Sequence, residues 1–278
     1  MNLELLAWLR SEQGQPVLAE AENADLGAPA RLRTLERLRR QATPEQAAAA
    51  YEMALLRRRA ADKFSHAAQM FFTRTGLEQS SGERIARQRA GRYAALLGGA
   101  GQVADLCCGI GGDTLALAQT NRVIAVDVDP VRLAIAQANA EALGVAGRVS
   151  FLQRDLEQTP PPECDAIFFD PSRRQAGRRV FRLAEYRPPI ALAQQWRRST
   201  PAIGIKLAPG VAHEELDTLG ATETEFISVD GELKEAVAWM GPLGVPGRRA
   251  TVMRAGAETV SLWFASGDSM PDVPIETP

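Results

Sequence analysis

The nine residues from Asp105 to Asp113, DLCCGIGGD, carry the strongest chemical signal of the 278-residue chain. Glycines allow the backbone to approach a ligand closely, and a helix that follows presents free backbone N–H groups. In open α/β sheets, ligands bind outside the carboxyl ends of the strands. Because this segment follows an apolar run typical of a buried strand, we predict a binding loop here. Its predicted ligand-binding residues are Asp105, Gly109, Gly111 and Asp113.

The ligand follows from the residues around this loop. The loop departs from the dinucleotide-binding pattern G-x-G-x-x-G/A, because its sixth position is Thr114. Asp127 and Asp129 end the second predicted strand, and Asp155 follows the third. These carboxylates suit a sulfonium cation and a ribose better than a pyrophosphate. Asp127 can accept both ribose hydroxyls and Asp155 can meet an adenine amino group, so we predict S-adenosylmethionine as cofactor and S-adenosylhomocysteine as product.

The fourth predicted strand, CDAIFFD, ends in Asp170-Pro171-Ser172, where a methyl acceptor would lie. Transfer from a sulfonium is an in-line displacement with a good leaving group, so the protein mainly positions the reactants, and no metal is required. Asp170 and Pro171 are the predicted catalytic residues: the carboxylate accepts a hydrogen bond from the acceptor, and the proline fixes the loop. Carboxylates at four successive strand ends are the motif order of class I S-adenosylmethionine-dependent methyltransferases.

A basic segment follows this motif. Residues 171–198 contain eight arginines and one acid, although the whole chain has a net charge of −2. This segment is either a solvated helix face or a surface for RNA phosphates. Arg173, Arg174 and Lys206 are the predicted substrate-binding residues; for Lys206, which ends the fifth predicted strand, a structural role is equally open.

Three regions would position these residues. Residues 1–97 are rich in Ala, Leu, Arg and Glu at helical spacing and predict a helical domain, with a helix after Thr43-Pro44 and another over Gly82–Leu97. Residues 98–266 alternate strands and helices, which indicates a parallel sheet, and end in two antiparallel pairs, the first turning at Asp230-Gly231. Residues 267–278 predict an acidic, proline-rich tail or linker.

Longer stretches resemble a known group. DLCCGIGGDTLALA, RVIAVDVDPVRLAIAQANAEALGVAGRVSFLQRD and CDAIFFDPSRR resemble the trimethylguanosine synthase-like branch of RNA methyltransferases. KFSHAAQMFFTRTGLEQSS, DPSRRQAGRRVF, YRPP, KLAPG and SVDGELKEAVAWMGPL resemble a bacterial family of class I methyltransferases. Longer members of that family carry a C-terminal THUMP-like region, an RNA-binding type of module, which we do not expect in this chain. The likeness covers about residues 43–264.

The resemblance implies an α/β, Rossmann-like sheet of order 3-2-1-4-5-7-6, its last-placed strand antiparallel, with an N-terminal helical domain. It also implies that residues 63–97 lead into the core, and that Phe72 and Ser80 close over the methyl donor. The cap-modifying relatives carry a base-stacking aromatic after the fourth motif. Here that stretch reads Ser172-Arg173-Arg174, and arginine can stack on a base or bind phosphate instead.

Other classes of protein are disfavoured. The chain has no run of about 18 apolar residues and no basic, apolar leader at its start, so we expect neither a membrane span nor a signal peptide. Its three cysteines fit a reducing, cytoplasmic location. The expected activity is methylation of a base nitrogen of RNA. The alternatives are an NAD-dependent oxidoreductase and a non-catalytic RNA-binding relative, and the oligomeric state stays open.

Overall fold

The computed structural model describes residues 1–172, 174–175, 178–179 and 182–265. The predicted substrate-binding residue Arg173 and the predicted tail at 267–278 lie outside the described residues. The chain divides into two units, Met1–Ile167 and Phe168–Pro278, which are taken in turn below. In the described ranges, no helix combines the length and the apolar character needed to cross a membrane.

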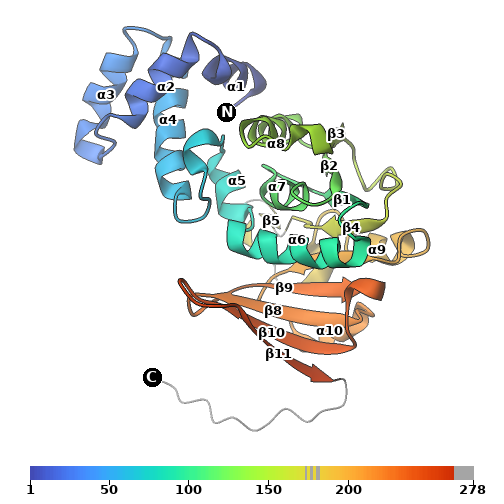
Figure 1. Ribbon diagram of the computed structural model, residues 1–278. Helices are drawn as coiled ribbons and strands as arrows, with labels where there is room; N and C mark the ends of the chain where they lie inside the picture. The colour runs from blue at the N-terminus through green and yellow to red at the C-terminus, as the bar shows by residue number, and fades with distance from the viewer. Residues whose placement is uncertain (173, 176–177, 180–181, 266–278) are drawn as a thin grey trace. The chain divides into compact units, whose positions relative to one another are not determined.

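The first unit begins with four helices, drawn in blue in Figure 1: α1 (Leu3–Arg10), α2 (Gly14–Glu22), α3 (Arg31–Leu38) and α4 (Pro44–Ala60). The start of α4 is a capping box. Thr43 Oγ1 accepts the Gln46 N–H at 3.3 Å, and Gln46 Oε1 accepts the Thr43 N–H at 3.0 Å. The predicted start of this helix is therefore confirmed, with Pro44 at its first position.

Two further helices lead from this bundle into the sheet: α5 (Arg74–Gln79) and α6 (Glu83–Leu97). The predicted helix over Gly82–Leu97 is confirmed, because Gly82 is the N-cap of α6. The helix ends at Gly98, whose φ of 62° is readily adopted only by glycine.

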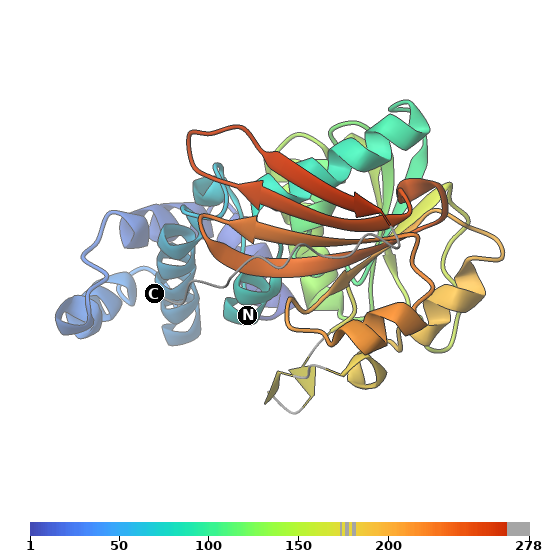
Figure 2. The ribbon, with the colours of Figure 1, turned by 90° about the horizontal axis from the view of Figure 1, so that it is seen from below.

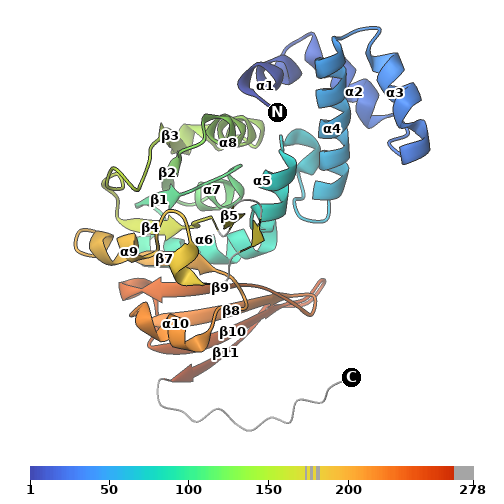
Figure 3. The same cartoon turned by 180° about the vertical axis from the view of Figure 1, so that it is seen from behind.

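The parallel strands of the first unit are β1 (Gln102–Leu106), β2 (Arg122–Asp127) and β3 (Val149–Gln153). Helix α7 (Gly112–Leu117) follows β1, and α8 (Pro130–Ala142) follows β2 (Figure 3). β2 pairs in parallel with both β1 and β3. The strand–helix alternation predicted from the sequence is thus confirmed, and it brings the carboxyl ends of β1 and β2 to one edge.

The second unit contains α9 (Ala191–Trp196), α10 (His213–Thr218), the two-residue strands β5 (Arg174–Gln175) and β6 (Arg178–Arg179), and the strands β7 (Ile203–Leu207), β8 (Glu223–Val229), β9 (Glu232–Met240), β10 (Gly247–Met253) and β11 (Val260–Ala265). Figure 2 shows the last four strands side by side, in orange to red. The turn between β8 and β9 is the predicted one, with φ values of 52° at Asp230 and 85° at Gly231. Helix α9 begins only at Ala191, after Arg187 has formed a β-bridge with Ser172.

The hydrogen-bonded strand order is β11-β10-β8-β9-β7-β4-β1-β2-β3, where β4 is Ala166–Phe169. Its last seven positions, read from β3 to β8, are the predicted order 3-2-1-4-5-7-6. The predicted antiparallel strand is β9, which runs antiparallel to β7 and β8. The second predicted antiparallel pair, β10 and β11, extends the sheet, with β10 parallel to β8. The predicted α/β fold class is therefore confirmed, and the sheet has two strands more than predicted.

Candidate functional site

The glycine loop, residues 107–112, joins β1 to α7 with three residues in the left-handed region: Cys107 (φ 65°), Gly109 (φ 59°) and Gly111 (φ 88°). At Gly111 a Cβ would lie only 3.2 Å from the Cβ of Ala136 on α8, so both the backbone conformation and the close approach require glycine. At Gly109 a Cβ would meet no atom within 4 Å. The loop backbone is therefore open to a ligand at Gly109.

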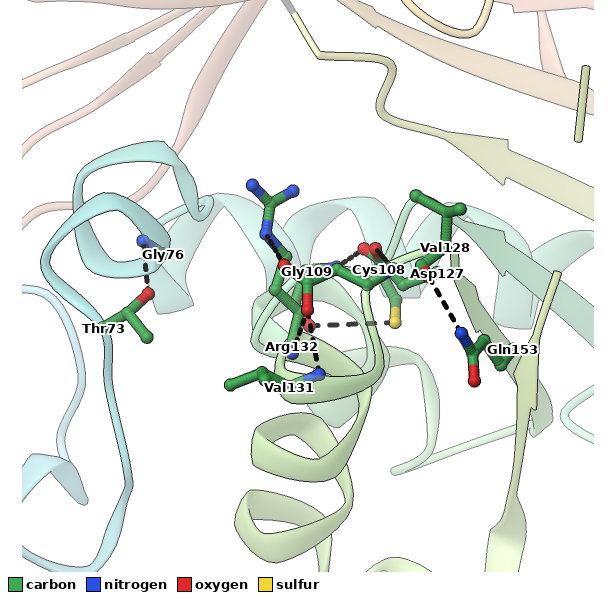
Figure 4. A network of polar contacts seen from close by, with 10 residues as sticks. Thr73, Gly76, Cys108, Gly109, Asp127, Val128, Val131, Arg132 and Gln153 are labelled. Atoms are coloured by element: carbon green, nitrogen blue, oxygen red, sulfur yellow. Dashed lines mark hydrogen bonds and ion pairs between the residues drawn. The ribbon is translucent and has the colours of Figure 1, made fainter. Parts of the chain in front are cut away.

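Asp127, at the end of β2, binds the glycine loop with one carboxylate oxygen and the start of the segment after β2 with the other (Figure 4). Its Oδ2 accepts the Gly109 N–H and its Oδ1 accepts the Asp129 N–H, both at 2.9 Å. Burial raises the pKa of the Asp127 carboxyl, and these two hydrogen bonds only partly offset that rise. A carboxylate has about four lone-pair sites, so two remain for further donors such as ribose hydroxyls.

Asp105 and Asp113 already have protein partners. Asp105 is buried and accepts a hydrogen bond from the hydroxyl of Thr114, the residue that breaks the dinucleotide pattern. Asp113 forms an ion pair with Arg89 of α6, which is fully buried. Both carboxylates therefore stabilise the backbone at the two ends of the loop through these contacts. Sequence reasoning missed Arg89; its only signal was an arginine on the apolar side of a predicted helix.

Asp155 follows β3 and caps the turn after it. Its Oδ1 accepts the Glu157 N–H at 2.9 Å, and its Oδ2 accepts from Gln158 Nε2 at 2.7 Å. Contact with an adenine amino group stays a prediction for this half-buried residue, because its remaining lone pairs could still accept one.

The cover segment, residues 63–81, packs directly on the glycine loop. A Cβ at Gly112 would lie 3.3 Å from Ser80 Cβ, and a Cβ at Gly76 would lie 2.4 Å from Ile110 Cγ2. Phe72 is fully buried, with its ring 5.9 Å from that of Phe64. The structure thus brings the predicted Ser80 to the loop, whereas contact of Phe72 and Ser80 with a methyl donor stays a prediction.

The predicted acceptor residues lie in the second unit. Asp170 is 22% exposed, and its Oδ2 lies 2.8 Å from Nζ of Lys206, which is 3% exposed at the end of β7. Pro171 is buried, and the Ser172 N–H donates to the Arg187 carbonyl at 2.7 Å. Lys206 therefore has a structural partner in the predicted catalytic carboxylate. Of Arg174 only the backbone, in β5, is described.

No group of three or more His, Cys, Asp or Glu side chains in the described part of the chain is arranged to hold a metal ion. Cys108 is buried between the carboxylates of Asp105 and Asp127. Its burial, with the charge of these neighbours, raises the pKa of its thiol well above the ordinary value. A neutral thiol in this position acts as a small packing residue.

Two separate segments of the chain match known protein families. Residues 103–183 match the methyltransferase domain family, and residues 2–60 match a domain of unknown function. An uncharacterised S-adenosylmethionine-dependent methyltransferase of Mycobacterium tuberculosis is 35% identical over 231 residues, or 80% of this chain and 60% of that protein. Residues 103–183 therefore form a methyltransferase domain, and the chain is similar to S-adenosylmethionine-dependent methyltransferases over 231 residues. It spans 60% of the length of this methyltransferase relative.

Two further methyltransferase likenesses are more limited. The trimethylguanosine synthase of Schizosaccharomyces pombe is 36% identical over 58 residues, which are 20% of this chain and 24% of that enzyme. The crystal structure of a candidate methyltransferase from Porphyromonas gingivalis W83 superimposes with a TM-score of 0.69 at 22% identity, covering 90% of this chain and 65% of that one. That structure supports the methyltransferase fold alone.

Proposed function

We propose that this methyltransferase moves the methyl group of S-adenosylmethionine to a nitrogen of an RNA base. The observation that carries the proposal is the glycine loop, open at Gly109 and held by Asp127, in a chain whose Asp170 carries a paired lysine. Methyl transfer requires a site that binds the methyl donor and a side chain that positions the methyl acceptor.

The residues of the first unit fit the methyl donor. S-adenosylmethionine supplies an electrophilic methyl on a sulfonium, a good leaving group. Asp127 has lone pairs left for the ribose hydroxyls, and its carboxylate, with that of Asp105, attracts the cation. The positive-φ glycines let the backbone approach the donor closely. The cover segment excludes water from this side of the loop, because Ser80 and Gly76 pack against it.

The residues of the second unit fit the methyl acceptor. Nζ of Lys206 lies 2.8 Å from Oδ2 of Asp170 and holds this carboxylate in place, and the carboxylate accepts a hydrogen bond from an N–H of the acceptor. That bond orients the nitrogen lone pair for in-line attack. The N–C bond forms as the S–C bond breaks, the S–C electron pair stays on the sulfur, and the nitrogen then gives its proton to the Asp170 carboxylate. Pro171 restricts the loop that carries this carboxylate.

RNA as the acceptor rests on charge and on the short likeness to trimethylguanosine synthase. The described part of the basic segment leaves Arg182, Arg187 and Arg198 exposed, as phosphate contacts require. Arg173 and Arg174 are proposed to stack on the base or bind its phosphate. A reducing, cytoplasmic setting is proposed with this role, and it agrees with the three free cysteines.

The test is methyl incorporation from labelled S-adenosylmethionine into total RNA, with bulk protein as the comparison acceptor. We expect label in RNA with the wild type and at least a tenfold loss with Asp170→Asn, whose amide is a weaker acceptor. Label in protein alone would overturn the RNA acceptor. Binding of both RNA and S-adenosylmethionine without any transfer would identify a non-catalytic relative.

A further inference from the structure

The side-chain amide of Asn139 forms hydrogen bonds with the middle of the cover segment. Asn139 lies on α8 and is fully buried. Its Oδ1 accepts the Phe71 N–H at 2.6 Å, and its Nδ2 donates to the Phe71 carbonyl at 3.1 Å. One amide thus satisfies both backbone groups of Phe71, as a neighbouring strand would.

The same amide also holds the glycine loop. Nδ2 of Asn139 donates its second hydrogen to the carbonyl of Ile110 at 2.9 Å. Both hydrogens and the oxygen of the amide are therefore engaged, and the two carbonyl partners fix which end is nitrogen. Because Ile110 lies between Gly109 and Gly111, Asn139 links the Phe71 backbone to the loop backbone by hydrogen bonds, in addition to the packing of Gly76 and Ser80 on the loop.

The N-terminal helices hold the same peptide from the other side. Arg57 of α4 is 9% exposed, and its Nε donates to the Met70 carbonyl at 2.8 Å. Its guanidinium carbon lies 5.0 Å from the centroid of the Phe71 ring, within the range of a cation–π contact. Its remaining end pairs with Glu22 of α2 at 2.7 Å. Planar stacking together with directed donation is a role that lysine cannot fill.

We propose that the helices within residues 2–60, which match a domain of unknown function, order the methyl-donor site through Arg57, together with Asn139 of α8, a pair we call the clamp. Both are positioning residues: they order Met70–Phe71 and the Ile110 carbonyl before the donor binds. Ordering a loop in advance removes that entropic cost from the binding step. This inference rests on the proposed donor site at the glycine loop.

The clamp makes a reciprocal prediction. If an ordered Phe71 peptide favours donor binding, then bound S-adenosylmethionine must favour the ordered peptide by the same factor. Saturation with the donor should therefore slow hydrogen exchange of the Phe71 amide in the wild type. The Asn139→Ala variant should lose most of this protection, because the acceptor of that amide is gone.

The experiment uses the full chain and four variants. Asn139→Ala removes the hydrogen bonds to Phe71, and Arg57→Met removes the hydrogen bond to Met70. Arg57→Lys keeps a cation for Glu22 but loses the bond to Met70 and the planar stack on Phe71. Asn121→Ala is the matched control, since Asn121 is also buried but its Nδ2 donates to Thr120, away from the clamp. Donor affinity by calorimetry and the melting temperature are measured for each.

We expect Asn139→Ala and Arg57→Met to weaken S-adenosylmethionine binding roughly tenfold. Arg57→Lys should weaken it several-fold, with a melting temperature near that of the wild type. Asn121→Ala should lower the melting temperature and leave donor affinity unchanged. The proposal is overturned if Arg57→Lys and Asn139→Ala bind the donor as the wild type does, or if all four variants lose affinity in proportion to their loss in melting temperature.

A separate variant distinguishes failure of the proposed donor site from failure of the proposed clamp. Asp127→Ala tests the donor site itself, because the hydrogen bonds of Asp127 go to the N–H groups of Gly109 and Asp129 and not to Arg57 or Asn139. If Asp127→Ala has wild-type donor affinity, the glycine-loop site is wrong. If Asp127→Ala weakens binding while the clamp variants do not, the site stands and the clamp is wrong.

Discussion

Asp127 uses one lone pair of Oδ2 for the Gly109 N–H of the glycine loop and one lone pair of Oδ1 for the Asp129 N–H, which leaves the other lone pairs for a ligand. Asp127→Asn turns one of its oxygens into a donor facing a backbone N–H or a ribose hydroxyl. We expect the affinity for S-adenosylmethionine to fall by about 1–3 kcal/mol. Calorimetry measures this loss. The control is Asn2→Ala, which removes the N-cap of α1 and should cost about 1 kcal/mol of stability without changing donor affinity.

The raised pKa of Asp127 gives a second expectation at this scale. Burial favours the protonated form in the folded chain, so this group contributes stability at low pH, and that contribution falls as the pH rises from the unfolded pKa through the folded pKa. Donor binding has the opposite sign, because only the ionised carboxylate accepts from both ribose hydroxyls. Affinity for S-adenosylmethionine should therefore decrease as the pH drops through the folded pKa. Calorimetry across the acid range measures it, and an Asp127→Asn profile identical to the wild type would contradict the assignment.

Lys206 and Asp170 form a pair whose disruption should separate catalysis from donor binding. Lys206→Met leaves the carboxylate without its cation, so we expect at least a tenfold fall in kcat, unchanged affinity for S-adenosylmethionine and lower stability. The double variant Lys206→Met, Asp170→Asn removes the uncompensated charge and should recover stability without activity. Recovery of activity in that variant would exclude a catalytic role for the carboxylate.

At the scale of elements, the contact between α5 and the glycine loop is testable at one glycine. A methyl group at Gly76 would lie 2.4 Å from Ile110 Cγ2 and 2.8 Å from Thr73 Oγ1, so Gly76→Ala must push α5 away from the loop. We expect a loss of about 1–3 kcal/mol in stability from this overpacking, together with weaker donor binding. Chemical denaturation and calorimetry measure the two effects.

Gly91 on α6 is the matched control for that substitution. Nothing lies within 4 Å of a Cβ placed there, so Gly91→Ala should stabilise the helix by roughly 0.5–1 kcal/mol and leave donor affinity unchanged. Equal donor affinities for both alanine variants and the wild type would show that α5 does not press on the donor site.

Local signals explain how much of the fold could be predicted. The capping box at Thr43, the glycine at the end of α6 and the Asp230-Gly231 turn all act within a few residues. Asn139, in contrast, acts on a backbone group 68 residues away, and nothing in the periodicity of α8 distinguishes it from a packing residue. The pairing of β10 with β8 is equally non-local. Sequence therefore predicted the strand ends that carry carboxylates and missed the side chains that tie them to distant segments.

At the scale of the whole molecule, charge is concentrated where the predicted acceptor motif ends. Residues 171–198 hold eight arginines against one acid in a chain of net charge −2. If they bind RNA phosphates, replacing Arg173 and Arg174 with Ala should weaken RNA binding and reduce the slope of log affinity against log salt by roughly 1–1.5. Filter binding at several salt concentrations measures the slope, with donor affinity unchanged.

The control for the arginine pair removes the same charge elsewhere. Arg33 and Arg40 are exposed in the N-terminal helical region, so their double alanine variant should keep the wild-type slope. Equal slopes for both double variants would remove Arg173 and Arg174 from the RNA surface. The domain boundaries predicted at residues 97 and 266 also belong to this scale and stay predictions.

The most direct test of the proposed methylation of an RNA base nitrogen is to identify the methylated atom. RNA labelled by the purified protein with isotopically marked S-adenosylmethionine is digested to nucleosides and analysed by mass spectrometry, beside RNA treated with Asp170→Asn. We expect one nucleoside that carries the labelled methyl on a base nitrogen, strongly reduced in the Asp170→Asn sample. Labelled methyl on the ribose or on a base carbon, or equal labelling by both proteins, would contradict it.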